Sequence, residues 1–325
     1  MTRSPTRRPG RRASGPAGPA TRTDRRVSAM QVVIAGSHGF IGSALVPHLR
    51  RGGHDVRVLV RGPAQGTAQI SWDPDAGRLD PDAVAGADAV VNLAGVNPGS
   101  RPLTKARKRE VLSSRLNTTG LLSRTLAALD DGPRVLLQAS GIGAYGSRGD
   151  DVLDEDEPIG TTFFAHVVRH WEAATAPAQD AGVRVVHQRT GIVLGQGGGA
   201  LGRLLPLLRA GVGGRLGSGR QFWPWITLLD HVRAVEHLLT APVHGPVNLV
   251  TAPARNAEVV AALARAMHRP AVVPVPAFAL RAVLGDFSSE VLGSIRAIPA
   301  VLDASGFEPV HADLVTAARW VARRD

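Results

Sequence analysis

The sequence predicts an α/β fold with a doubly wound parallel sheet, and three features of the chain carry this prediction. Short, fully apolar runs with the length of buried strands recur between Gln31 and Gln188. Longer segments whose apolar residues follow helical spacing separate these runs. A glycine-rich turn joins the first apolar run to the first helical segment. Because parallel strands need crossover helices that cover both faces of the sheet, this alternation favours a doubly wound sheet.

The elements of the first part of the chain alternate in order. In 40–50, Ile41, Leu45, Val46 and Leu49 share one face, as expected for a helix packed on a sheet. The expected strands are 31–35, 56–60, 69–72, 89–93, 134–139 and 183–188, and the expected helices are 40–50, 103–129 and 162–181.

After position 194 the pattern becomes less regular. Glycine dominates 196–219, and 221–226 is aromatic. We expect Asn256 to be the N-cap of its helix, since its short polar side chain can accept a hydrogen bond from the first turn. The expected helices are 201–209, 229–240, 256–267, 278–284 and 312–323, with a strand at 247–250.

Charge is distributed unevenly along the chain. The formal net charge is +11, but residues 1–29 hold eight arginines and one acid, so they carry +7 and leave +4 for the rest. This extension has almost no apolar side chains, and we expect it to be disordered. An extension without a role in the fold, a transit peptide and a translation start upstream of Met30 all fit its composition. Without it, nothing predicts a nucleic-acid partner.

Composition also excludes several kinds of site. The chain has no cysteine, which excludes disulfides and thiolate zinc sites. It has no apolar run long enough to span a membrane. Its histidines are scattered, and we expect the acidic run 150–157 to be a solvated loop, so no metal site is predicted.

The turn after the first strand gives the strongest functional signal. Glycines at its first, fourth and seventh positions allow a tight turn, a close approach of backbone to pyrophosphate, and packing of helix on strand. The free N–H groups at the start of the helix then bind the phosphates. The predicted cofactor-binding residues of this turn are Gly36, His38, Gly39, Phe40, Ile41 and Gly42.

Arg61 follows the second strand, 19 residues after Gly42. A site that prefers NAD usually has an acidic residue here, which binds the ribose 2′-hydroxyl. An arginine suits a 2′-phosphate, so we expect NADP(H) to be preferred over NAD(H). A surface arginine without a role is the alternative.

Two further turns complete a recognisable set. Asn92-Leu93-Ala94-Gly95 ends the fourth strand, and Ser140 on the fifth strand is followed by Ala144-Tyr145-Gly146. Together with the glycine turn, they resemble the extended short-chain dehydrogenase/reductases. The stretches 108–119, 171–219 and 269–306 resemble, more narrowly, an epimerase-like family of largely unassigned activity. The similarity runs from Met30 nearly to the end of the chain, and 269–306 resembles that family's own C-terminal domain.

This resemblance implies a domain organisation and further site residues. It implies a Rossmann domain at 30–195 and a smaller, interwoven substrate-side domain at 196–325, with 221–250 returning to the first. Ser140 would lie near the nicotinamide. The other cofactor-binding residues that it implies are Leu93, Ala94 and Gly95 beside the adenosine and ribose, Asn117 on the helix beneath the active site, and Thr190 and Gly191 at the carboxamide.

The acid/base pair of the superfamily, a tyrosine four residues before a lysine, is absent. Tyr145 is the only tyrosine, and position 149 is glycine. Counting back from Glu172, taken as the glutamate that follows the tyrosine by eight residues in relatives, puts Phe164 and Val168 at the places of the pair. Neither can transfer a proton.

Ser140 and Tyr145 are therefore the candidate catalytic residues. Ser140 could polarise a carbonyl group, and Tyr145 could donate a proton, with packing or substrate contact as the alternative for Tyr145. For Trp171 and Glu172 we expect a packed ring and a solvated carboxylate. Arg220 beside Trp223 suits an anionic or ring-bearing substrate, with core packing as the alternative for the ring.

Three functions stay open. The first is an NADP(H)-dependent oxidoreductase that acts on a small carbonyl or hydroxyl compound. The second is a non-catalytic NADP(H)-binding sensor or regulatory protein, and the third is a nucleotide-sugar epimerase or dehydratase. We expect a cytoplasmic monomer or homodimer with an unidentified small-molecule substrate.

Overall fold

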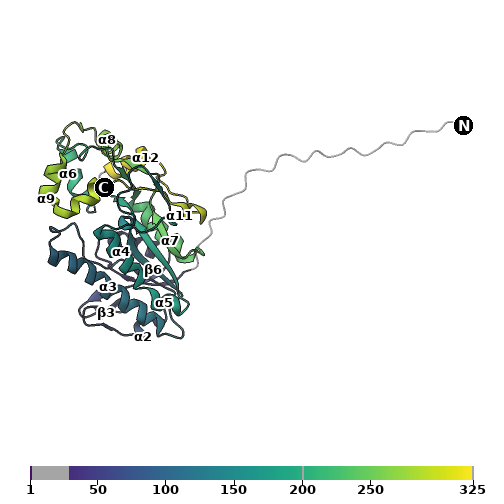
Figure 1. Cartoon of the computed structure of the whole chain (residues 1–325). Helices are drawn as coiled ribbons and strands as arrows, with labels where there is room; N and C mark the ends of the chain where they lie inside the picture. Colours follow the sequence, from purple (N-terminus) through teal and green to yellow (C-terminus); the bar gives the residue numbers. More distant parts are fainter. Residues whose placement is uncertain (2–28, 200, 324–325) are drawn as a thin grey trace.

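A sheet of eight strands forms the centre of the computed structural model, which describes Met1 and residues 29–199 and 201–323 (Figure 1). The strand order is β12-β8-β6-β5-β1-β2-β3-β4. Neighbouring strands are parallel, except that β3 and β4 are antiparallel. Since the first strand lies inside the sheet and the chain winds outward from it in both directions, the predicted doubly wound sheet is confirmed. The arginine-rich extension, 2–28, lies outside the described residues.

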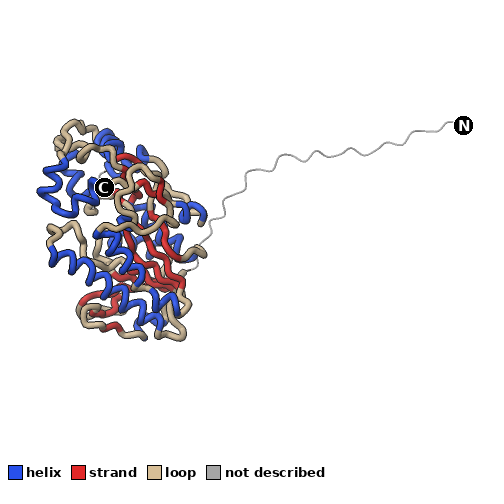
Figure 2. The backbone as a smooth tube through the Cα atoms, in the orientation of Figure 1, coloured by secondary structure: helices blue, strands red, loops and turns tan. Residues whose placement is uncertain are grey.

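Helices flank the strands along most of the chain (Figure 2). The strands of the large sheet are β1 Gln31–Ala35, β2 Asp55–Arg61, β3 Gln69–Asp73, β4 Arg78–Leu79, β5 Ala89–Asn92, β6 Val135–Gly141, β8 Arg184–Thr190 and β12 Gly245–Leu249. Three short pairs are β7 Val152–Leu153 with β14 Arg296–Ala297, β9 Ile192–Leu194 with β11 Trp225–Thr227, and β10 Phe222–Trp223 with β13 Ala254–Arg255. The helices are α1 Gly42–Arg51, α2 Asp82–Ala85, α3 Lys105–Ala127, α4 Phe163–Ala173, α5 Ala176–Asp180, α6 Leu201–Arg209, α7 Leu228–Thr240, α8 Asn256–Ala266, α9 Ala277–Leu284, α10 Ser288–Leu292, α11 Ala300–Ala304 and α12 Leu314–Ala322, with 3₁₀ turns η1 Ile142–Ala144 and η2 Gly285–Phe287.

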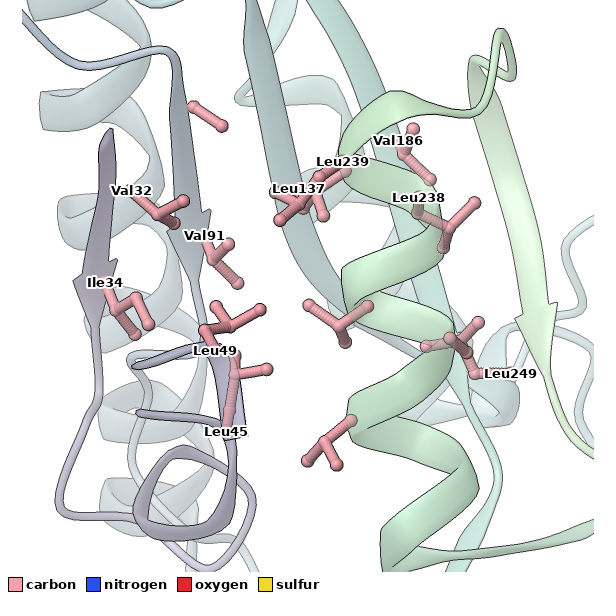
Figure 3. Packing of buried hydrophobic residues seen from close by; sticks show 14 of the residues in the cluster. Val32, Ile34, Leu45, Leu49, Val91, Leu137, Val186, Leu238, Leu239 and Leu249 are labelled. Carbon is pink, nitrogen blue, oxygen red and sulfur yellow. The ribbon is translucent and has the colours of Figure 1, made fainter. Parts of the chain in front are cut away.

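Each face of the large sheet has its own apolar core, because successive side chains of a strand point to opposite faces. Val32 and Ile34 of β1 pack with residues of α1, α7 and α11, and Figure 3 shows Leu238 and Leu239 of α7 in this layer. Side chains of α2, α3 and α5 pack with the opposite face of the sheet.

The C-terminal helices form a second body with a core of its own. Figure 1 shows α6, α8, α9 and α12 gathered at one end of the molecule. Buried leucines, valines and alanines of α6, α8 and α12 pack together there. Between these helices in sequence, α7 and β12 lie with the large sheet instead, because β12 pairs with β8 and α7 covers one face. None of the helices in the described part of the chain combines the length and apolar composition of a membrane crossing.

Two local expectations were wrong. The segment expected as one helix, 162–181, is broken into α4 and α5 at Ala174–Thr175. Pro177, in the first turn of α5, has no N–H to continue a helix. Helix α8 begins at Asn256 itself, and the side chain of Glu258 accepts from the backbone N–H of Arg255 at 2.7 Å.

Candidate functional site

The strand ends that carry the predicted site residues lie at one edge of the large sheet. Ala35 lies opposite Asn92 in β5, and Gly141 at the end of β6 lies opposite Thr190 at the end of β8. The glycine turn, the turn after β5 and the end of β6 are therefore neighbours at the carboxyl edge. This is the edge at which ligands bind in open α/β sheets.

The three glycines of the first turn have different reasons to be glycine. Gly36 has φ +84°, and a Cβ added to it would lie 2.7 Å from the carbonyl carbon of Leu93. A Cβ on Gly42 would lie 2.2 Å from the carbonyl oxygen of Gly36. At Gly39 the nearest atom would be 3.3 Å away, also the Gly36 oxygen. Protein packing thus requires Gly36 and Gly42, whereas Gly39 leaves room beside the backbone.

The start of α1 offers free donors at this turn. Gly39 donates to Gly36 and Ser43 donates to Gly39, but the N–H groups of Phe40, Ile41 and Gly42 have no backbone acceptor among the described residues. Free N–H groups at the positive end of a helix suit a pyrophosphate. The residues present therefore fit a dinucleotide.

Two side chains of the turn contact their surroundings. Nδ1 of His38 lies 3.2 Å from the hydroxyl of Ser37. The ring of Phe40 packs against the glycine-rich segment that precedes α6, where a Cβ on Gly198 would lie 2.6 Å from the ring. The cofactor turn and the entrance to the C-terminal body are thus in direct contact.

An exposed polar cluster lies where β2 ends. The guanidinium of Arg61 pairs with Asp75 at 2.9 Å, and both side chains are more than half exposed. The other oxygen of Asp75 accepts from the amide of Asn117 at 3.0 Å. The side chain of Asn117, on α3, therefore points toward the polar cluster at the end of β2.

The turn after β5 is held by side chains of neighbouring elements. The oxygen of the Asn92 amide accepts from the N–H of Ala94 at 3.1 Å. Gly95 adjoins Arg115 of α3, whose guanidinium stacks over the ring of Trp171 at 4.6 Å. Burial lowers the pKa of Arg115 to about 10. Leu93, Ala94 and Gly95 thus form a fixed surface next to Gly36.

Ser140 belongs to a buried hydrogen-bond network. Its hydroxyl donates to Glu172 of α4 at 2.6 Å, and Glu172 accepts both the Nε and Nη2 groups of Arg189 at 3.0 Å. The expectation of a solvated Glu172 was wrong, since its side chain is 10% exposed. Burial works against a charged guanidinium, but the hydrogen bonds and charge of Glu172 hold the pKa of Arg189 above its usual value.

Tyr145 ends this network. Its hydroxyl accepts from Nη1 of Arg189 at 3.1 Å and donates to the amide oxygen of Asn248 at 2.8 Å. The residue is 1% exposed, and burial raises the pKa of its phenol. A proton that is already donated within the core is poorly placed for a substrate, so this geometry favours packing over proton transfer.

The end of β8 leaves little space for a side chain. A Cβ on Gly191 would lie 2.5 Å from the carbonyl oxygen of Pro224. The hydroxyl of Thr190 lies 3.1 Å from Nε2 of His231, a fully buried residue of α7. Burial lowers the pKa of His231 to about 4, so its imidazole is neutral near pH 7.

The places of the missing acid/base pair are apolar. Phe164 packs edge-to-face against Phe163 and Phe287, and Val168 is buried. A Cβ on Gly141 would meet no atom within 4 Å, so open space adjoins the residue after Ser140.

The predicted substrate residues are separated. Trp223 is buried, and its indole N–H donates to the carbonyl of Val291 at 3.1 Å. Arg220 is exposed and lines a cavity of about 690 Å³ together with Arg255 and Asp150. Arg255 pairs with Asp150 at 3.0 Å.

The acidic run 150–157 differs from the expected solvated loop at β7, where Leu153 is buried, and at Glu155. Glu155 is buried, and its carboxylate accepts from the backbone N–H of Asn248 at 2.9 Å. Burial raises the pKa of Glu155. No local pattern predicts this burial, because the loop meets β12 only in the folded chain.

Comparisons with known proteins agree with this geometry. The model of the NAD dependent epimerase/dehydratase family matches residues 32–250, and a domain of unknown function, DUF1731, matches residues 275–321. An epimerase family protein of Mycobacterium tuberculosis is 44% identical over 296 residues, which are 90% of this chain and 98% of that one.

Two solved structures are similar along the same stretch. The crystal structure of the human epimerase family protein SDR39U1 with NADPH has 36% sequence identity and a TM-score of 0.83, and the match covers 90% of this chain and 99% of that one. The nucleoside-diphosphate sugar epimerase of Corynebacterium glutamicum has 32% identity and a TM-score of 0.74, over 91% of this chain and 58% of that one.

Proposed function

The chain belongs to the NAD dependent epimerase/dehydratase family, and from this premise we propose that it is an NADP(H)-dependent oxidoreductase. Its substrate would be a small compound that carries a carbonyl or hydroxyl group. The observation that carries the proposal is the glycine turn, where the space at Gly39 and the free N–H groups at the start of α1 adjoin each other.

Two observations support NADP(H) over NAD(H). Arg61 places an exposed guanidinium at the end of β2, where a 2′-phosphate would bind. The human relative was crystallised with NADPH. Asp75 holds Arg61 at this end of the sheet, and a 2′-phosphate would compete with Asp75 for the guanidinium.

The network below the nicotinamide side orients Ser140. The bound cofactor supplies or accepts a hydride. Because the Ser140 hydroxyl donates to Glu172, its oxygen can accept a hydrogen bond from a substrate hydroxyl. Arg189 compensates the charge of Glu172, and Tyr145 holds Arg189. We therefore assign Tyr145 a positioning role.

A titration of the full chain with NADPH and with NADH tests the proposal. We expect micromolar binding of NADPH, followed by nicotinamide fluorescence or by calorimetric heat. The substitution Arg61→Ala should weaken NADPH binding toward the level of NADH, since the lost contact belongs to the 2′-phosphate alone.

Arg78→Ala is the matched control, because Arg78 is also an exposed arginine paired with an aspartate, Asp73. It should leave both affinities unchanged. If neither dinucleotide binds, the oxidoreductase proposal fails. If Arg61→Ala weakens NADH and NADPH equally, the proposed preference for NADP(H) fails.

A non-catalytic NADP(H)-binding sensor is the second candidate, and the apolar residues Phe164 and Val168 favour it. Oxidation of bound NADPH in a single turnover with a panel of carbonyl compounds separates it from an enzyme. The similarity to the Corynebacterium epimerase motivates a third candidate, a nucleotide-sugar epimerase, which binding of UDP- or GDP-sugars would favour. The cytoplasmic location and the monomeric or dimeric state stay predictions.

A further inference from the structure

A second cavity, of about 720 Å³, lies between the beginning of α4 and the segment that includes α9 and α10. Phe163 and Phe164 of α4 line it, together with Leu103, Lys108 of α3 and Glu290 of α10. Its lining thus combines residues of the sheet-covering helices with residues of the C-terminal body. Counting back from Glu172 places Phe164 where the missing tyrosine would stand.

Glu290 is close to the end of β6. A Cβ added to Gly143, three residues after Ser140, would lie 2.8 Å from Oε2 of Glu290 and 3.2 Å from Cβ of Phe164. The carboxyl group therefore adjoins both the segment that follows Ser140 and the place of the missing tyrosine.

The carboxyl group of Glu290 has no hydrogen-bond or ion-pair partner among the described residues. The Glu290 side chain is half-buried, and a partly buried carboxyl group without a partner is less stable in its charged form than one in water. Burial raises the pKa of Glu290 to about 7, so both its protonated and ionised forms are present near neutral pH.

The other charged groups of the cavity do not pair with Glu290. Lys108 of α3 pairs with Asp286 of η2 at 2.5 Å and lies over the ring of Phe163. Arg281 of α9 lines the cavity with an exposed side chain. The residues of α4 and η1 that face Glu290, Phe164 and Gly143, are uncharged.

The backbone around Glu290 is held from two directions. The indole of Trp223 and the amide of Gln221 both donate to the carbonyl of Val291, at 3.1 and 3.4 Å. The N–H of Ser294 donates to the hydroxyl of Ser147 at 3.1 Å. Proton transfer requires a group that is held at a fixed place. These hydrogen bonds fix the backbone that follows Glu290.

We propose that Glu290 is the acid and base of the substrate cavity and does the work of the missing tyrosine. In reduction, the carbonyl carbon gains a hydride from the reduced cofactor, and the carbonyl oxygen takes the proton of the Glu290 carboxyl group. The resulting carboxylate regains a proton from solvent. In oxidation, the carboxylate would accept the hydroxyl proton, and the oxidised cofactor would accept the hydride from the same carbon. Phe163, Phe164 and Leu292 give the cavity one apolar side for the body of a small carbonyl compound, while most of the rest of the lining is polar or charged. The inference rests on the proposed oxidoreductase function.

The test compares Glu290→Gln with the wild type in the full chain, using the carbonyl panel and NADPH. The wild-type kcat of reduction should fall as pH rises through about 7, because only the protonated carboxyl group can donate. Glu290→Gln should lose roughly 10²- to 10⁴-fold in kcat and lose this pH dependence, as expected for removal of a general acid. The affinity for NADPH should change less than about threefold, since no cofactor contact is removed.

Glu110→Gln is the control, because Glu110 is an exposed glutamate of α3 that does not line the cavity. It should keep the wild-type kcat and pH profile. If Glu290→Gln keeps them as well while NADPH-dependent turnover persists, the inference fails and the oxidoreductase proposal stands. If the wild type binds NADPH but reduces no compound of the panel, both fail.

Thermal unfolding gives a readout without substrate. Glu290→Gln should melt several degrees above the wild type at about pH 8, where the wild type must ionise a partnerless carboxyl group, and close to it at about pH 5. A variant that melts below the wild type at both pH values would show a structural role for Glu290 and overturn the inference.

Discussion

Arg189 is the residue that keeps the base of the candidate active site ordered. Its guanidinium binds Glu172 through two nitrogens and the hydroxyl of Tyr145 through the third. Removing one partner of a buried ion pair leaves an uncompensated charge, which destabilises the folded protein more than removing both partners does. The network therefore behaves as a unit, and its members have to be tested by the most conservative substitutions.

Tyr145→Phe tests whether the phenol moves a proton. The substitution leaves the Asn248 amide oxygen and one arginine donor without a partner, so we expect a loss of about 1–3 kcal/mol in the free energy of unfolding, measured in urea. The kcat of reduction should stay within about tenfold of the wild type. A loss of more than about a hundredfold, with the fold intact, would restore Tyr145 as the proton donor.

His231 is expected to lower the free energy of unfolding as the pH falls. Its pKa is about 4 in the folded protein and about 6.5 in an unfolded chain. Below about pH 6.5 the unfolded state therefore binds a proton that the native state does not, and stability falls as pH falls toward 4. The expected loss is up to about 3 kcal/mol.

His231→Gln removes this contribution while keeping a polar group near Thr190. Urea unfolding at about pH 4.5 and pH 7.5 should show a smaller acid-induced loss for this variant than for the wild type. His244→Gln, at an exposed position, should behave like the wild type. Equal acid-induced losses in all three proteins would rule out His231 as the group responsible.

At the scale of elements, two glycines of the turn between β1 and α1 have different roles. We expect Gly42 to be needed for folding, and Gly39 to be needed mainly for cofactor binding. Gly42→Ala would force a methyl group to 2.2 Å from the Gly36 oxygen, so we expect both stability and NADPH binding to fall. Gly39→Ala requires only a small shift from a 3.3 Å approach. It should leave the melting temperature nearly unchanged and weaken NADPH binding more than about tenfold, because the methyl group fills the space at the pyrophosphate.

Calorimetric titration and thermal melts of the two variants, side by side, measure this contrast. If Gly39→Ala binds NADPH as tightly as the wild type, the pyrophosphate does not approach the turn at that point. A Gly42→Ala protein with wild-type stability would mean that the turn relaxes more easily than its packing indicates.

Helices and strands were predictable from the sequence where one local pattern determines the element. The apolar runs predicted β1, β2, β3, β5, β6 and β8 to within a few residues, because buried strands are rich in apolar residues. The break between α4 and α5 was missed, although Pro177 carried a signal for it. A helical pattern of apolar residues continues across such a break, so periodicity alone cannot show it.

The candidate site was predictable only in part, because much of it is made by the whole molecule. The glycine turn has a local signature, and so does Ser140 through its resemblance. The environments of Glu172 and Glu290 have none, because each carboxyl group lies against a segment that is distant in the sequence. Sequence alone presents both as ordinary glutamates of helices, which are usually solvated.

The order in which the chain visits the two bodies limits how this protein can be altered. The helix α6 belongs to the C-terminal core, α7 and β12 return to the large sheet, and α8 belongs to the C-terminal core again. A fragment that stops at Gly195 would lack the edge strand and the helix that cover Leu137 and Val186, leaving that apolar face open to water. No single cut releases either body intact. The C-terminal body therefore cannot be exchanged between proteins as one continuous segment. Changing the substrate range requires substitutions and loop changes within the cavities.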